Sequence, residues 1–142
     1  MAPFTHPLRV RFGECDPHGI VFNANYVAYF DVAITELWRE ALGSWAAMVE
    51  RGVDAVVGEV NARFHAPARA DELLELRVWI EGFGTTSVRI RVDVAREGFV
   101  LVEGSLRYVF VDAESWAPVP IPEWLRDGLA PYAGMGSSAS AP

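Results

Sequence analysis

One long helical pattern followed by four strand patterns constrains the fold of this chain more than any other feature. Between residues 26 and 41 the apolar residues recur at spacings of three and four, which is typical of a helix with one apolar face, and Gly43 is suited to end it. A mostly apolar helix of about 20 residues is buried only if a curved sheet wraps around it. The order of the patterns therefore predicts the α+β class.

Three strand patterns joined by short turns follow a longer valine-rich segment. Residues 53–66 are rich in Val, and the segments 74–81, 88–94 and 100–111 alternate apolar and polar side chains, as half-buried strands do. Because consecutive strands with short turns pair antiparallel, these segments predict an antiparallel meander. Trp79 interrupts the charged side of its strand, so we expect it to mark a surface for a partner.

A shorter strand pattern precedes the long helix. Leu8, Val10 and Phe12 alternate with arginine and glycine, and Pro17 and Gly19 then break the pattern. We therefore expect a first strand with these three apolar side chains on its buried face, followed by a turn that leads into the helix.

The length and the ends of the chain predict one domain. At 142 residues the chain is long enough for a sizeable core, and we assign the domain to residues 1–130, with short helices over 44–52 and 123–129. Residues 131–142 are rich in Gly, Ser and Ala, so we expect a disordered tail. No apolar run approaches the roughly 20 residues of a membrane span, and the first residues lack the features of a secretory signal. We expect a cytoplasmic protein.

The composition excludes several classes of function. The net charge of −7, with 19 acidic and 12 basic residues, argues against binding nucleic acid through a basic surface. All 12 basic residues are Arg, which excludes Schiff-base chemistry and a lysine-dependent phosphate loop. The single cysteine, Cys15, excludes an internal disulfide, and the three histidines lack the close spacing of a metal site. We therefore expect neither a metal nor another cofactor.

Asp16 lies at the break between the first strand and the long helix. The first N–H groups of a helix have no intrahelical acceptor and carry partial positive charge, so they can bind a developing oxyanion. A carboxylate beside such a site favours acyl chemistry. The same residue before Pro17 also suits a structural role, as a turn former that accepts backbone N–H groups.

Residues 12–31, with the order of the elements after them, resemble the hotdog-fold thioesterases of the 4-hydroxybenzoyl-CoA thioesterase type and their acyl-CoA relatives. The match spans most of residues 5–130, and its most specific part is Asp16-Pro17-His18-Gly19-Ile20-Val21 followed by Asn25-Tyr26. The resemblance implies a hotdog fold, in which an antiparallel curved sheet wraps around one long central helix. It also implies dimers that pair their sheets, often tetramers, with the active site at the dimer interface.

The resemblance implies a role for each matched residue. Asp16 would be the catalytic carboxylate, as nucleophile on the thioester carbonyl or as general base for water, and the backbone N–H at Asn23 would polarise the carbonyl. Asp31 matches an acidic position that faces a ring hydroxyl of the substrate, although pairing with a nearby Arg is equally compatible with its place on an apolar helix. The other substrate-binding candidates are His18, Gly19, Val21 and Tyr26.

The resemblance implies that the protein hydrolyses an acyl-CoA to the free acid and CoA, for aromatic or short-chain acyl groups. Where the hydroxybenzoyl-type enzymes have a basic run that binds the CoA phosphates, this chain has residues 83–87, which are uncharged. The alternative sources of positive charge are the neighbouring subunit or Arg63, Arg69, Arg89 and Arg91.

The alternative functions are a thioesterase for acyl carrier protein substrates, an acyl-thioester-binding hotdog protein without hydrolase activity, and a ligand-binding α+β domain. An acidic protein repels an acidic carrier, which favours CoA.

Overall fold

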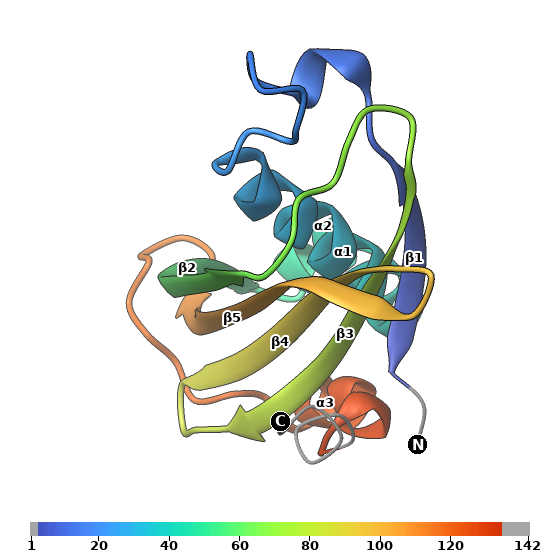
Figure 1. The fold of residues 1–142 in the computed structure, drawn as a ribbon. Coiled ribbons are helices and arrows are strands. Elements are labelled where there is room, and N and C mark those ends of the chain that lie inside the picture. Colours follow the sequence, from blue (N-terminus) through green and yellow to red (C-terminus); the bar gives the residue numbers. More distant parts are fainter. Residues whose placement is uncertain (1–2, 135–142) are drawn as a thin grey trace.

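One five-stranded sheet curves around a long helix in this protein, as the computed structural model shows for residues 3–134 (Figure 1). The elements in chain order are β1 (Phe4–Arg9), η1 (Phe12–Glu14), α1 (Asn25–Leu42), α2 (Trp45–Glu50), β2 (Val53–Phe64), β3 (Leu73–Phe83), β4 (Ser87–Arg96), β5 (Phe99–Asp112), α3 (Glu123–Leu129) and η2 (Ala130–Tyr132). The architecture confirms the predicted α+β class and hotdog arrangement.

The strand order in the sheet is β1-β3-β4-β5-β2, and every neighbouring pair is antiparallel. The predicted meander is therefore present in β3, β4 and β5. Strand β2 pairs with the far side of β5 and forms one edge, while β1 forms the other. Register shifts occur at Val57/Glu59, Ile80/Gly82 and Val94/Ala95, and such bulges increase the local bend of a strand.

The core lies between α1 and the inner face of the sheet. The predicted apolar face of α1 is buried. Its seven buried residues are Tyr26, Tyr29, Phe30, Ala33, Ile34, Leu37 and Trp38. The helix approaches β5 so closely that a Cβ on Gly104 would overlap the ring of Phe30. Glycine at this position therefore allows the sheet to wrap tightly around α1.

The beginning of the chain differs from the prediction. Strand β1 ends at Arg9, and Phe12 lies in a turn with 86% of its surface exposed, whereas Val10 is buried. The expected buried position of Phe12 is wrong because the chain turns before it: the Glu14 N–H donates to the Arg11 carbonyl, and the Glu14 carboxylate accepts from the Arg11 N–H. Period-two alternation alone did not reveal this turn.

The expectation for Trp79 is also wrong. Its side chain is only 3% exposed, and the guanidinium of Arg91, which is opposite it on β4, lies 5.3 Å from the ring centroid. Within the described residues, the buried Nε1 of Trp79 has no hydrogen-bond partner. The indole is therefore part of the packing of this chain and is not available to a partner.

The ordered part of the chain extends past the expected boundary at residue 130. Ala133 forms a parallel bridge with Ile80, and the Gly134 N–H donates to the Ile80 carbonyl. Residues 135–142 of the expected tail lie outside the described residues. Among the helices that the structure describes, none is both long and apolar enough to cross a membrane.

Candidate active site

Asp16 lies in a tight loop formed by residues 15–22, which we call the Asp16 loop. Cys15 and Val21 form an antiparallel bridge across its base. The Asp16 N–H donates to the Ile20 carbonyl at 2.9 Å, and the Gly19 N–H donates to the Asp16 carbonyl at 2.9 Å. Gly19 has a φ of 79°, in the left-handed region that glycine adopts without strain. The sequence prediction of a turn between strand and helix is confirmed.

One oxygen of the Asp16 carboxylate supports the loop itself. Oδ1 accepts a hydrogen bond from the His18 N–H at 2.8 Å and lies 3.5 Å from the His18 Nδ1, while the imidazole is largely exposed. Within residues 3–134, the other oxygen, Oδ2, forms no hydrogen bond. The Asp16 side chain is 18% exposed, so the carboxylate is partly accessible from solvent. The structural role predicted for Asp16 is present and leaves one oxygen available for chemistry.

The start of α1 lies beside the Asp16 loop. The N–H groups of Asn25, Tyr26 and Val27 donate to carbonyls three residues earlier, at 2.8 to 3.2 Å. In the described part of the chain, the N–H groups of Asn23 and Ala24 have no acceptor. Unpaired donors before the first turn are the expected feature of a helix N-terminus. The catalytic role of the Asn23 N–H stays a prediction.

A second segment, residues 66–69, holds the loop from the β2–β3 connection. The Val21 N–H donates to the Ala68 carbonyl at 2.9 Å, and Ile20 forms a bridge with Arg69. The Tyr26 hydroxyl accepts from the Ala68 N–H at 3.3 Å. Val21 and Tyr26 are both buried. These two predicted substrate-binding residues therefore position the loop, whereas His18 and Gly19 lie on its exposed side.

Asp31 lies on the exposed side of α1, away from the Asp16 loop. It is six residues after Asn25, which corresponds to roughly 9 Å along a helix axis. Among residues 3–134 its carboxylate forms no ion pair, so the arginine partner considered from the sequence is not found. It lies close enough to Tyr108 that its charge, after the larger effect of burial, contributes to the raised pKa of that phenol.

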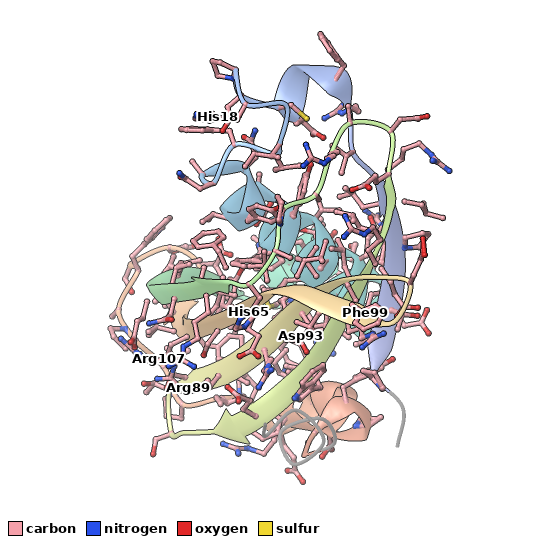
Figure 2. The ribbon with its side chains drawn as sticks, viewed as in Figure 1. His18, His65, Arg89, Asp93, Phe99 and Arg107 are labelled. Atoms are coloured by element: carbon pink, nitrogen blue, oxygen red, sulfur yellow. The ribbon has the colours of Figure 1, made fainter. Side chains whose placement is uncertain are left out.

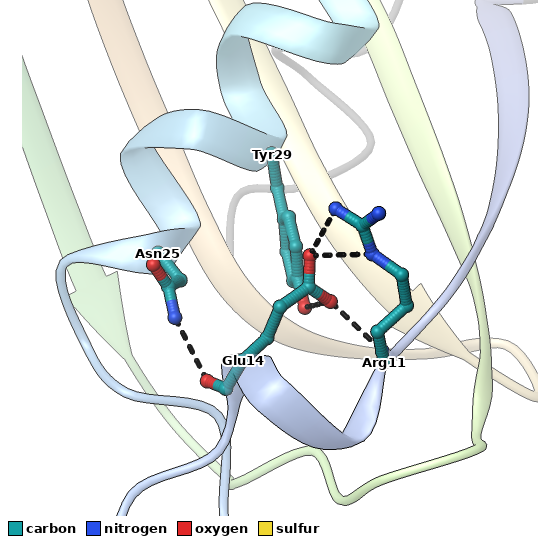
Figure 3. A network of polar contacts seen from close by, with 4 residues as sticks. All are labelled: Arg11, Glu14, Asn25 and Tyr29. Atoms are coloured by element: carbon teal, nitrogen blue, oxygen red, sulfur yellow. Dashed lines mark hydrogen bonds and ion pairs between the residues drawn. The ribbon is translucent and has the colours of Figure 1, made fainter.

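Glu14, a residue that sequence reasoning missed, connects the loop to α1 (Figure 3). Its carboxylate accepts hydrogen bonds from the Arg11 N–H at 2.8 Å, the Tyr29 hydroxyl at 2.9 Å and the Arg11 guanidinium at 3.1 and 3.3 Å. Partial burial raises the pKa of Glu14, but these hydrogen bonds outweigh it and hold the pKa below its usual value. Burial and the bond to Glu14 raise the pKa of Tyr29.

The candidate arginines differ in how their charge is balanced. Arg89 and Arg107 both pair with Glu59, and Arg91 pairs with Asp93 and Glu103. In the described part of the chain, the side chains of Arg63 and Arg69 have no such ion pair. Figure 2 shows His18 at the top of the molecule, on the Asp16 loop, and Arg89 and Arg107 at the lower left, on the sheet and far from it. Arg69 is therefore the arginine best placed to meet a ligand at the Asp16 loop.

A groove of about 440 Å³ lies elsewhere, between β1, β3 and the β4–β5 turn. It contains none of the predicted site residues, and Glu72, Glu75 and Glu97 line it together with Arg96, which pairs with Glu72. The lining carries more negative than positive charge, which does not suit the phosphates of CoA. In residues 3–134 there is no cluster of three His, Cys, Asp or Glu side chains that could hold a metal ion.

Known proteins share both the sequence pattern and the fold. Residues 10–129 match the family model of the thioesterase-like superfamily. The acyl-CoA thioester hydrolase YbgC of Escherichia coli O157:H7 is 33% identical over 121 residues, which cover 84% of this chain and 90% of that protein. The putative acyl-CoA thioesterase YneP of Bacillus subtilis is 25% identical over 122 residues, covering 82% and 88%. The crystal structure of a thioesterase superfamily protein from Jannaschia sp. CCS1 superimposes with a TM-score of 0.88 at 27% identity, covering 93% and 94%.

Proposed function

Because this chain belongs to the thioesterase-like superfamily, we propose that it hydrolyses acyl-CoA thioesters to the free acid and CoA. The observation that carries the proposal is that, among residues 3–134, one oxygen of the Asp16 carboxylate and the N–H groups of residues 23 and 24 form no hydrogen bond, and both lie where the Asp16 loop meets α1. Acyl transfer requires a nucleophile or general base and an oxyanion donor, and a carboxylate and a backbone N–H can fill these two roles.

The reaction begins with the thioester carbonyl facing the start of α1. The N–H of Asn23 donates to the carbonyl oxygen and stabilises the negative charge that forms there. Asp16 either attacks the carbonyl carbon, giving a mixed anhydride that water then hydrolyses, or accepts a proton from the water that attacks. In both routes a C–O bond forms, the C–S bond breaks, and CoA leaves as a thiolate that takes up a proton.

CoA is the proposed carrier of the acyl group. The protein carries a net charge of −7, which disfavours an acidic carrier protein. Arg69 lies next to Ile20 of the Asp16 loop, and its guanidinium is not neutralised by an ion pair among residues 3–134. We assign to it a contact with a phosphate of CoA. The exposed rings of Phe22 and Phe64 near the loop suit an aromatic or short apolar acyl group.

We further propose that the protein acts as a homodimer paired through β2. This strand is 12 residues long and lies at an edge of the sheet, where Val57, Val60 and Phe64 are exposed. Val27 and Val32 are exposed on α1. A long edge strand with exposed apolar side chains favours pairing with another chain. A second copy of β2, running antiparallel, would cover this edge.

Thiol release from a panel of acyl-CoAs tests the proposed function. The panel contains hydroxybenzoyl, phenylacetyl, short-chain and long-chain thioesters, and each is offered to the wild type and to Asp16→Asn. We expect release by the wild type and a loss of at least about 100-fold in the variant. Asp71→Asn is the matched control, because Asp71 is an exposed loop carboxylate outside the site. Equal release by wild type and Asp16→Asn contradicts the assignment, and release only from acyl carrier protein substrates contradicts the choice of CoA.

A further inference from the structure

The hydrogen bonds of Glu14 join the Asp16 loop to the start of α1. The proposed hydrolysis requires these two parts of the candidate site to keep a fixed relative position. Glu14 is two residues before Asp16 and is in η1, whereas its partners Tyr29 and Asn25 are on α1. The network thus spans the junction between the carboxylate and the helix start that supplies the N–H donor. No step of the proposed hydrolysis uses Glu14 itself.

Both the main chain and the side chain of Glu14 form hydrogen bonds to the end of the Asp16 loop and to α1. Its carbonyl oxygen accepts from the Asn25 Nδ2 at 2.8 Å and from the Phe22 N–H at 3.0 Å. Its carboxylate accepts from the Tyr29 hydroxyl at 2.9 Å (Figure 3). Residue 14 is therefore tied to the end of the Asp16 loop and to the first two turns of α1.

The partner on the helix is itself fixed. Tyr29 is 2% exposed, and its ring packs edge-on against Tyr26 with the centroids 5.6 Å apart. The Glu14 carboxylate is only 20% exposed and accepts two hydrogen bonds on each oxygen, so it has a single favourable orientation. The charge-assisted hydrogen bond between the Glu14 carboxylate and the buried Tyr29 hydroxyl therefore fixes the distance between the loop and α1.

We propose that Glu14 is a positioning residue, which holds the Asp16 loop against the start of α1 through Tyr29 and Asn25. The Asp16 carboxylate and the Asn23 N–H then face the same thioester carbonyl. This inference rests on the proposed function, and it requires no contact between Glu14 and the substrate. Because a displacement of about 1 Å in a reacting group can cost 100-fold in rate, a loosened loop slows the chemical step more than it weakens binding.

Kinetics of Tyr29→Phe, Glu14→Ala and Glu14→Gln test the inference. Tyr29→Phe removes only the donor hydroxyl, and Glu14→Gln keeps an acceptor oxygen for it. We expect kcat to fall about 10-fold or more in Tyr29→Phe and Glu14→Ala, with KM within about twofold of the wild type, and a smaller loss in Glu14→Gln. The double variant Glu14→Ala/Tyr29→Phe is expected to lose no more kcat than Glu14→Ala alone, because Glu14→Ala already breaks the hydrogen bond that Tyr29→Phe removes.

Glu36→Ala is the matched control. Glu36 pairs with Arg39 on the same helix at 3.2 Å, but this ion pair does not touch the loop. We expect its kcat to equal that of the wild type. A lower melting temperature with wild-type kcat in Tyr29→Phe and Glu14→Ala would overturn the positioning role and leave the network as a purely structural contact.

Amide hydrogen exchange separates failure of this inference from failure of the proposed function. The Asp16 N–H closes the loop on the Ile20 carbonyl, and the Val21 N–H joins the loop to the Ala68 carbonyl. We expect both to exchange about 10-fold faster in Tyr29→Phe, while the N–H groups of β4 keep their protection. Loss of activity in Asp16→Asn with unchanged exchange and kcat in Tyr29→Phe would overturn only the positioning role. Retained activity in Asp16→Asn would overturn the proposed function, and the exchange rates of the loop would still decide whether Glu14 holds it.

Discussion

Replacing Gly104 by alanine is expected to destabilise this fold at the contact where the sheet closes on α1. An added Cβ would overlap the Cζ of Phe30 and would lie 2.7 Å from its two Cε carbons, whereas ordinary contacts begin at 3.4 Å. The ring or the helix would therefore have to move by more than about 0.7 Å, the difference between 3.4 and 2.7 Å. Phe30 is completely buried, so the ring has no exposed side toward which it could turn. Overpacking of a well-packed core costs about 1–3 kcal/mol, and we expect the upper part of this range.

Thermal and urea unfolding of Gly104→Ala measure this cost. For a chain of this size, about 3 kcal/mol corresponds to a decrease of roughly 6–12 °C in melting temperature. Gly82→Ala is the matched control, since Gly82 is also in a strand and a Cβ there meets nothing within 4 Å. Phe30→Leu should recover part of the loss when combined with Gly104→Ala, because leucine is smaller. Equal unfolding midpoints for the two alanine variants would refute the reasoning about close approach.

Three further predictions concern charge and assembly. The pKa of Glu14 in the folded protein is below its unfolded value of 4.5, so its contribution to stability is present above pH 4.5 and is lost as the pH falls through the folded pKa. Glu14→Gln should therefore weaken the decrease in urea stability over this acidic range. An unchanged pH dependence would contradict this prediction. Val60→Glu should place a charge on the β2 edge and give monomers in light scattering, with reduced thiol release, whereas intact dimers would argue against pairing through β2. Arg69→Ala should raise KM several-fold for an acyl-CoA but not for the matching acyl-pantetheine, which lacks the nucleotide phosphates; an equal effect on both would exclude the phosphate contact.

Local patterns predicted much of this fold because they depend on few residues. The stripe of α1 and the alternation in β4 follow from the geometry of each element, and the structure confirms both. The edge position of β2 could not be predicted in this way, since pairing between β2 and β5 joins segments far apart in the chain. The buried place of Trp79 depends likewise on Arg91 across the sheet.

In the candidate site, too, the features that depend on a local motif were predicted, and those that depend on contacts between distant residues were not. The motif beginning at Asp16 identified the loop and the family, and the structure confirms the turn. The network around Glu14 escaped notice because its hydrogen bond to Tyr29 connects residues 15 positions apart, and nothing in the local pattern distinguishes that carboxylate from an exposed one. The catalytic roles of Asp16 and the Asn23 N–H, and the substrate contact of Asp31, stay predictions that kinetics must test.

The most direct test of the central claim compares binding and turnover in Asp16→Asn. The claim is that the Asp16 carboxylate performs chemistry in addition to supporting its loop. Asparagine keeps an oxygen that can accept from the His18 N–H, so the loop should retain its shape. We predict that the variant binds a CoA thioester with a Kd within about threefold of that of the wild type for a non-hydrolysable analogue, while its thiol release falls at least about 100-fold. Turnover close to that of the wild type, with binding intact, would contradict the account.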